Sequence, residues 1–291
     1  MPPAGRLWSG VSDRSATLAG LIAWAGMSAP HLYHEVHGSR GPFLLLVHGM
    51  LSSRAQWMLN IEALSAFCRP VVVELFGHGR SPTPDRPAAY SPKRYVAEFE
   101  AIRRALGAER WLVCGQSLGA ALTLRYSLDC PQRVIAQAFT NSNSALADEE
   151  WRERVIPLMS AQARHLRHVG HAALAGHPLN PARGKRLPAP ARAALVADYM
   201  LHTPEGIAAT GLYTVPESSI RNRAAAISVP TLLVAGEREK GFDEARALAE
   251  RAIPGIRALG LDAGHAVNLE AARAFNDAVA SLFAGQMNPT P

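Results

Sequence analysis

The pentapeptide GQSLG, residues 115–119, constrains the fold of this chain more than any other stretch. An apolar run over 111–114, typical of a short buried strand, precedes it, and a helical pattern over 120–126 follows it. A serine on so sharp a turn has a strained backbone, and glycines on both sides remove side chains that would collide with it. The pattern predicts that Ser117 is an exposed nucleophile, with the N–H of Leu118 at a helix start facing a developing negative charge.

Apolar runs alternate with helical patterns along most of the chain. Strands are predicted at 31–36, 43–47, 70–75, 111–115, 134–139, 230–236 and 256–261. Helices are predicted at 54–66, 92–106, 120–126, 243–252 and 266–283. This alternation predicts an α/β fold with a mostly parallel central sheet and helices on both faces.

The strands stop between 145 and 215, where two helical stretches, 148–176 and 189–212, are predicted. This segment is expected to be a helical lid inserted into a core made of 28–144 and 216–285. Residues 1–27 contain a short apolar run after two arginines, which fits either a secretory signal or a disordered or mis-annotated start. We expect the latter, because the first strand pattern begins only near His31.

The composition is that of a globular protein, with 48% hydrophobic and 19% charged residues among 291. No apolar run approaches the roughly 18 residues of a membrane span. The net charge of +6 comes almost entirely from scattered arginines, which do not form the basic stripe of a nucleic-acid surface. Cys68, Cys114 and Cys130 lack metal-ligand spacing and a paired framework. We expect a cytoplasmic protein without metal or cofactor, or a secreted one if 1–27 is a signal; the oligomeric state stays open.

Together these features resemble the α/β-hydrolase superfamily over about residues 31–284. Two more motifs carry the resemblance: His48-Gly49-Met50 at the end of a buried strand, and Gly264-His265 after the last strand. The resemblance implies that the backbone N–H groups of Met50 and Leu118 form an oxyanion hole. It also implies that His265 is the general base that takes the proton of Ser117, while His48 braces its loop.

The acid of the implied triad is less well defined. The resemblance places it after the strand that ends at Gly236, where an aspartate is usual three residues later. Glu239 occupies that position and is our first candidate, followed by Glu237 and then Asp243. The alternative that all three are solvated loop charges, and that Ser117 and His265 act without them, stays open.

Two further groups of polar residues receive structural interpretations. The segment 74–81 resembles the D-x-x-G-x-G-x-S turn of the same superfamily, with Glu74 in place of aspartate, and is expected to brace the site, with a structural His78. The predicted lid holds His165, His168, His171 and His177 together with Arg152, Arg154, Arg164 and Arg167. Their helical spacing prevents three histidines from sharing one metal ion. A solvated face is expected, and recognition of a carboxylate or phosphate is a further hypothesis.

Three functions are compatible with these motifs. The first is a serine hydrolase that cleaves an ester or thioester of a small to medium acyl substrate through an acyl-enzyme. The second uses the same triad as a carbon–oxygen lyase or carbon–carbon bond hydrolase, because residues 236–242 are similar to the acid loop of the menaquinone-pathway synthase. The third is a non-enzymatic ligand-binding protein, which the presence of both Ser117 and His265 disfavours.

Overall fold

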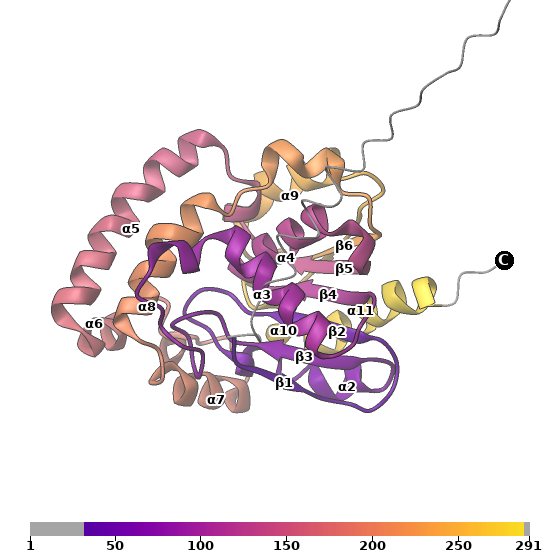
Figure 1. Ribbon diagram of the computed structural model, residues 1–291, viewed down its shortest axis with the longest axis horizontal. Helices are drawn as coiled ribbons and strands as arrows, with labels where there is room; N and C mark the ends of the chain where they lie inside the picture. Colours follow the sequence, from indigo (N-terminus) through magenta and orange to yellow (C-terminus); the bar gives the residue numbers. More distant parts are fainter. Residues whose placement is uncertain (1–31, 288–291) are drawn as a thin grey trace, which may run out of the picture.

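The computed structural model describes residues 32–287, and the predicted leader 1–27 lies outside this range (Figure 1). Seven strands form one sheet in the order β1-β3-β2-β4-β5-β6-β7, with β1 antiparallel to β3 and all other pairs parallel. The strands are β1 His34–Val36, β2 Phe43–Val47, β3 Arg69–Val73, β4 Trp111–Gly115, β5 Val134–Thr140, β6 Thr231–Gly236 and β7 Arg257–Leu261. The predicted mostly parallel α/β sheet is confirmed.

Helices cover both faces of this sheet (Figure 1). The α-helices are α2 Ile61–Ser65, α3 Pro92–Ala105, α4 Leu118–Asp129, α5 Glu149–Val169, α6 His171–Gly176, α7 Ala189–Tyr199, α8 Pro204–Ala209, α9 Asp243–Ala252, α10 Val267–Glu270 and α11 Ala272–Met287. Along β2, Leu45 and Val47 join the apolar cluster under α3, α4 and α9, whereas Leu44 and Leu46 join the cluster under α2 and α11. Alternate residues of one fully buried strand therefore build both cores.

Two predicted helices are interrupted in the structure. The segment 54–66 forms a 3₁₀ turn, Arg54–Trp57, and then α2, while 266–283 divides into α10 and α11. Buried side-chain amides connect the two interrupted segments. Asn60 Nδ2 donates to the Asn268 carbonyl at 2.9 Å, and Asn268 Nδ2 donates to the Gln56 carbonyl at 2.6 Å. These long-range hydrogen bonds satisfy backbone groups that a continuous helix would have used, so tertiary contacts outweigh the helical pattern.

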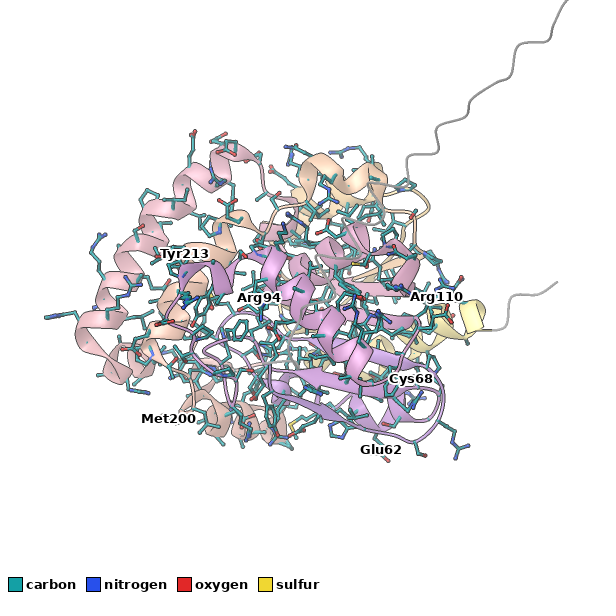
Figure 2. All side chains as sticks on the ribbon, viewed as in Figure 1. Glu62, Cys68, Arg94, Arg110, Met200 and Tyr213 are labelled. Atoms are coloured by element: carbon teal, nitrogen blue, oxygen red, sulfur yellow. The ribbon has the colours of Figure 1, made fainter. Side chains whose placement is uncertain are left out.

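Helices α5 to α8 lie between β5 and β6 in the chain and gather at one side of the sheet (Figure 1). Their apolar residues, including Leu166, Tyr199 and Ile207, pack with Leu51 from the loop after β2. Met200, just after α7, is 63% exposed and lies at the outer surface of this group (Figure 2). We call residues 145–215 the helical insertion; its action as a lid stays a prediction. None of the helices within 32–287 is long and apolar enough to cross a membrane.

Candidate active site

Ser117 lies at the turn between β4 and α4 with φ 55° and ψ −120°. A non-glycine residue at positive φ costs about 1–3 kcal/mol, so the surrounding structure must hold it in place. A Cβ atom at Gly115 would lie 2.4 Å from the Gly119 carbonyl oxygen, and one at Gly119 would lie 2.2 Å from the Val47 carbonyl oxygen. Any larger residue at either position would collide with the backbone that positions Ser117.

The loop after β2 packs directly against this turn. A Cβ atom at Gly49 would lie 2.7 Å from the Cβ atom of Ser117, and Met50 lines the same cavity as that serine. Leu118 is the first residue of α4, so its N–H has no acceptor within the helix. The two residues predicted to supply oxyanion donors therefore both belong to segments that adjoin Ser117.

His265 and Glu239 meet beyond the carboxyl ends of β7 and β6. His265 Nδ1 lies 2.8 Å from Glu239 Oε2, and Asn141 Nδ2 donates to the same oxygen at 2.7 Å. The orientation of the Asn141 amide is fixed because its Oδ1 accepts the Gly236 N–H at 2.8 Å. Asn141 is not among the residues predicted from the sequence, where its one signal is its place in the polar segment directly after β5.

Of the three candidate acids, Glu239 is the one that contacts His265. Glu237 is exposed, and its carboxylate lies 3.5 Å from Arg246. Asp243 is the exposed first residue of α9. The structure therefore brings Glu239 to His265 and leaves Glu237 and Asp243 apart from it; the assignment of Glu239 as the acid stays a prediction.

Opposing effects set the pKa of Glu239. Burial by itself would raise this pKa, but hydrogen bonds from His265 and Asn141 and the positive charge of Arg186 outweigh burial and hold it below its ordinary value. The carboxylate is therefore ionised at neutral pH. Its negative charge lies beside the imidazole on which a positive charge develops when a general base takes a proton.

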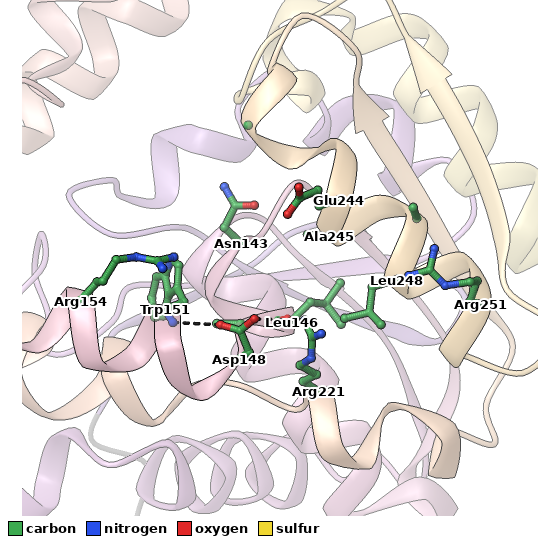
Figure 3. A pocket seen from close by; sticks show the side chains of 13 residues that line it. Asn143, Leu146, Asp148, Trp151, Arg154, Arg221, Glu244, Ala245, Leu248 and Arg251 are labelled. Carbon is green, nitrogen blue, oxygen red and sulfur yellow. Dashed lines mark hydrogen bonds and ion pairs between the residues drawn. The ribbon is translucent and has the colours of Figure 1, made fainter.

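Ser117 and His265 line one cavity of about 300 Å³. Gln116 Nε2 donates to the His265 carbonyl oxygen at 3.3 Å, which links the two loops. Two larger hollows of about 520 Å³ each flank Trp151, and their described lining residues include neither Ser117 nor His265. Figure 3 shows the first of them, where Asp148 accepts the Trp151 N–H at 2.9 Å. The smaller cavity is therefore the one that adjoins the reactive groups.

Residues 42–272 match the profile of the alpha/beta hydrolase fold family. The chain belongs to this family. A putative 2-succinyl-6-hydroxy-2,4-cyclohexadiene-1-carboxylate synthase from Bacillus subtilis is 26% identical over 246 residues, covering 82% of this chain and 89% of the synthase. The (lyso)-N-acylphosphatidylethanolamine lipase of Mus musculus is 36% identical over 93 residues, which span 31% of this chain and 27% of the lipase.

Solved structures of other hydrolase-fold proteins share the architecture. The enol-lactonase from Burkholderia xenovorans LB400 superposes with a TM-score of 0.73 at 22% identity, and the match covers 87% of this chain and 96% of the lactonase chain. MenH from S. aureus superposes with a TM-score of 0.77 at 17% identity, and the match covers 89% of this chain and 99% of MenH. These similarities establish the fold that both proteins share with this chain.

Three buried histidines of this hydrolase-fold chain serve as structural supports. His48 Nε2 accepts the Leu75 N–H at 3.1 Å, and His78 Nε2 accepts the Leu51 N–H at 3.0 Å. His202, from the helical insertion, accepts the Gly79 N–H through Nδ1 at 3.0 Å. Burial lowers the pKa of each to about 3, so all three are neutral acceptors at neutral pH. His48 and His78 thus occupy the structural positions expected of them, whereas the sequence analysis did not identify His202.

Glu74 lies under the neighbouring glycine-rich loop. Its carboxylate accepts the Arg80 N–H at 2.5 Å and the Arg54 N–H at 3.3 Å, and a Cβ atom at Gly79 would lie 2.3 Å from it. Burial raises the pKa of Glu74, although the hydrogen bonds oppose that shift. The longer side chain that replaces the usual aspartate therefore fits beneath a residue without a side chain, and it ties two loops together.

The histidines of the helical insertion do not converge on one point. His165, His168 and His171 are exposed, and His177 is half-buried beside Gln162. Within residues 32–287, no group of three or more histidine, cysteine, aspartate or glutamate side chains is placed to hold a metal ion. Among the described residues, the arginines that line the Ser117 cavity are Arg183 and Arg186, and not Arg152, Arg154, Arg164 or Arg167.

Proposed function

We propose that this protein is a serine hydrolase that cleaves an ester or thioester through an acyl-enzyme on Ser117. The observation that supports this most is the hydrogen-bonded pair Glu239–His265, which borders the same cavity as a serine held at positive φ. The cavity of about 300 Å³ lies at the lower end of the range for ligand sites, which suits a small to medium acyl substrate.

In the proposed reaction, Ser117 Oγ attacks the carbonyl carbon while its proton passes to His265 Nε2. The carbonyl electron pair moves onto oxygen, where the N–H groups of Met50 and Leu118 stabilise the negative charge. The tetrahedral adduct then expels the alcohol or thiol, which takes the proton from His265. Water, deprotonated by the same imidazole, attacks the acyl-enzyme and releases the acid, and the proton returns to Ser117. Glu239 holds the imidazole and stabilises its protonated form.

A fluorophosphonate probe tests this proposal, since it forms a covalent bond with an activated serine. We expect labelling of the wild-type protein, and mass spectrometry should place the adduct on Ser117. Ser117→Ala should abolish labelling, while Ser142→Ala, which changes a different serine, should retain it. A folded wild-type protein that is not labelled, and that hydrolyses none of a panel of p-nitrophenyl esters and acyl thioesters, would contradict the proposal.

The similarity to the Bacillus subtilis synthase over 82% of this chain favours a second candidate, in which the same groups act as a base for elimination. In that reaction His265 would remove a proton from carbon, a carbon–oxygen bond would break, and no acyl-enzyme would form. Hydrolysis of a carbon–carbon bond is a related alternative on the same fold. Acyl-enzyme trapping during turnover distinguishes these reactions: an adduct on Ser117 supports the hydrolase, and product formation without it supports elimination.

A non-enzymatic ligand-binding protein is the remaining alternative. It predicts saturable binding of a small molecule without turnover. The bound molecule would stay intact equally well in the wild-type protein and in Ser117→Ala. The ionised Glu239 and its contact with His265 argue against this alternative, because a binding site does not need an oriented base.

A further inference from the structure

Part of the wall of the Ser117 cavity comes from the helical insertion. Leu179, Pro181, Leu187 and Leu195 supply an apolar surface there. Three charged side chains also line the cavity, namely Arg183, Arg186 and Glu270. Two cations and one anion are therefore among the lining side chains, and the carboxylate of Glu239 lies next to the cavity through its contact with His265.

Glu270 neutralises Arg186. The side chain of Glu270 is 9% exposed and that of Arg186 is 55% exposed; Glu270 Oε2 lies 3.1 Å from Arg186 Nε and accepts the Gly264 N–H at 2.8 Å. The guanidinium of Arg186 also packs against Gly264, where a Cβ atom would lie 2.3 Å from Nη2. Arg186 therefore contacts Glu270 and Gly264, the residue that precedes His265. It is a positioning residue for the loop that carries the proposed base.

Arg183 has a different environment. Among residues 32–287, no carboxylate forms an ion pair with it. The 3₁₀ turn Pro181–Arg183 that presents it is well ordered by local contacts: Asn180 Oδ1 accepts the Ala182 N–H at 2.9 Å, and Pro181 is buried. The turn fixes the point at which Arg183 leaves the backbone, while its exposed side chain loses rotamer freedom when it binds an anion.

We propose that the cavity selects substrates bearing a carboxylate, and that Arg183 binds this carboxylate while the scissile carbonyl lies at Ser117. This inference rests on the proposed hydrolase function and names its substrate class. A guanidinium donates two parallel hydrogen bonds to a carboxylate, so it fixes the orientation of the substrate as well as attracting it. Arg183 and Ser117 line the same cavity of about 300 Å³, so both groups are accessible to a substrate bound there.

The charge of the cavity favours a carboxylate over a phosphate monoester. Of the side chains that line the cavity, Arg186 pairs with Glu270 and Arg183 has no carboxylate partner, while the ionised Glu239 does not line the cavity and contacts His265. A carboxylate carries one negative charge, whereas a phosphate monoester carries about −1.5 to −2 at neutral pH and would leave its excess unpaired near Glu270. The carboxylate is therefore the better match.

Two series of matched esters test this inference. In the first, p-nitrophenyl esters end in a carboxylate (glutarate and adipate half-esters) or in the corresponding neutral carboxamide. In the second, the carboxylate or carboxamide is on the alcohol and the acyl group is constant. The rate measured with Ser117→Ala is subtracted from each rate, which removes the uncatalysed hydrolysis of each ester. We expect the wild-type kcat/KM to favour the carboxylate about tenfold in one series, and 0.5 M salt to reduce that preference.

Matched variants assign the preference to one residue. Arg183→Gln should raise KM for the carboxylate ester about tenfold, change kcat little, and leave the carboxamide ester unaffected. Lys185→Gln makes the same change of charge two residues away, on an exposed side chain that does not line the cavity, and should keep the preference. Arg186→Gln should instead lower kcat for both esters alike, because it loosens the loop that carries His265. Circular dichroism and thermal unfolding check that each variant is folded.

Several results would overturn the inference. Equal kcat/KM values for carboxylate and carboxamide esters in both series would do so, as would a carboxylate preference that Arg183→Gln leaves intact. A stronger preference for esters that carry a phosphate would also contradict it, because the cavity would then select a dianion and not a carboxylate. The proposed function fails in a different way: then no ester of either series is cleaved above the Ser117→Ala background, and the fluorophosphonate probe does not label the protein.

Discussion

Replacing Glu239 with glutamine separates two contributions of the proposed triad acid, its charge and its control of the imidazole tautomer. Oε2 of Glu239 accepts hydrogen bonds from both His265 and Asn141, at 2.8 and 2.7 Å. Asn141 must present its N–H₂ group, because its Oδ1 is occupied by the Gly236 N–H. In Glu239→Gln the amide oxygen is therefore favoured at this position, and His265 keeps the tautomer that can accept a proton from serine.

The expected loss of activity follows from the charge alone. An opposite charge about 4 Å away is worth about 4 kcal/mol at an effective dielectric constant of about 20. The side chains of His265 and Glu239 are 48% and 24% exposed, and solvent screening reduces this value to about 3 kcal/mol. We therefore expect kcat/KM to fall by about 10²-fold, less than the loss of about 10⁴-fold seen when a triad histidine is held in the wrong tautomer.

The assay is hydrolysis of a neutral p-nitrophenyl ester, with Glu237→Gln as the matched control. Glu237 is exposed and its nearest cation is Arg246, so its replacement should change kcat/KM less than about twofold. Equal, mild losses in both variants would refute the assignment of Glu239 as the acid. A loss near 10⁴-fold in Glu239→Gln would refute the argument that Asn141 preserves the tautomer.

Two further predictions concern stability. His48, His78 and His202 have pKa values near 3 in the folded protein and about 6.5 when unfolded, so between these pH values the unfolded chain binds more protons and the folded state loses stability as the pH falls. The free energy of unfolding, measured with urea, should decrease by up to about 4 kcal/mol per pH unit below pH 6.5, and a value that does not change between pH 7 and pH 5 would contradict this. Gly119→Ala should destabilise the protein by about 3 kcal/mol or more, because its Cβ would lie 2.2 Å from a backbone oxygen, whereas Gly176→Ala, in helix α6 with open space around it, should be neutral or stabilising. Similar urea midpoints for the two variants would show that the contact at Gly119 is relieved at little cost.

The sequence predicts the parts of the molecule in which local pattern and tertiary structure agree. The strand 43–47 is apolar throughout because it is covered on both faces, and the pattern of Ser117 between glycines describes a turn that few other residues can adopt. Glu239 is the first candidate for the acid because the family resemblance places that residue three positions after Gly236, at the end of β6.

Long-range contacts account for what the sequence does not reveal. Asn60 and Asn268 are far apart in the chain, so nothing local indicates that their amides interrupt two helices. Asn141 is likewise an ordinary polar residue in the sequence, and only the register of the sheet brings it beside Glu239, 98 residues away. Glu270 is near Gly264 in the chain, but its partner Arg186 comes from the helical insertion. Side-chain partners this far apart depend on the assembled fold and leave no periodic signal.

The contacts of the helical insertion connect substrate recognition to the catalytic loops. On one side, His202 accepts the Gly79 N–H, next to His78, which holds the Leu51 N–H beside Met50. On the other side, the ion pair of Arg186 with Glu270 reaches the residue before His265. A displacement of the insertion therefore strains both the loop of the proposed oxyanion donor and the loop of the proposed base. Because the same segment carries Arg183, we infer that a substrate which engages this wall also stabilises the arrangement that cleaves it.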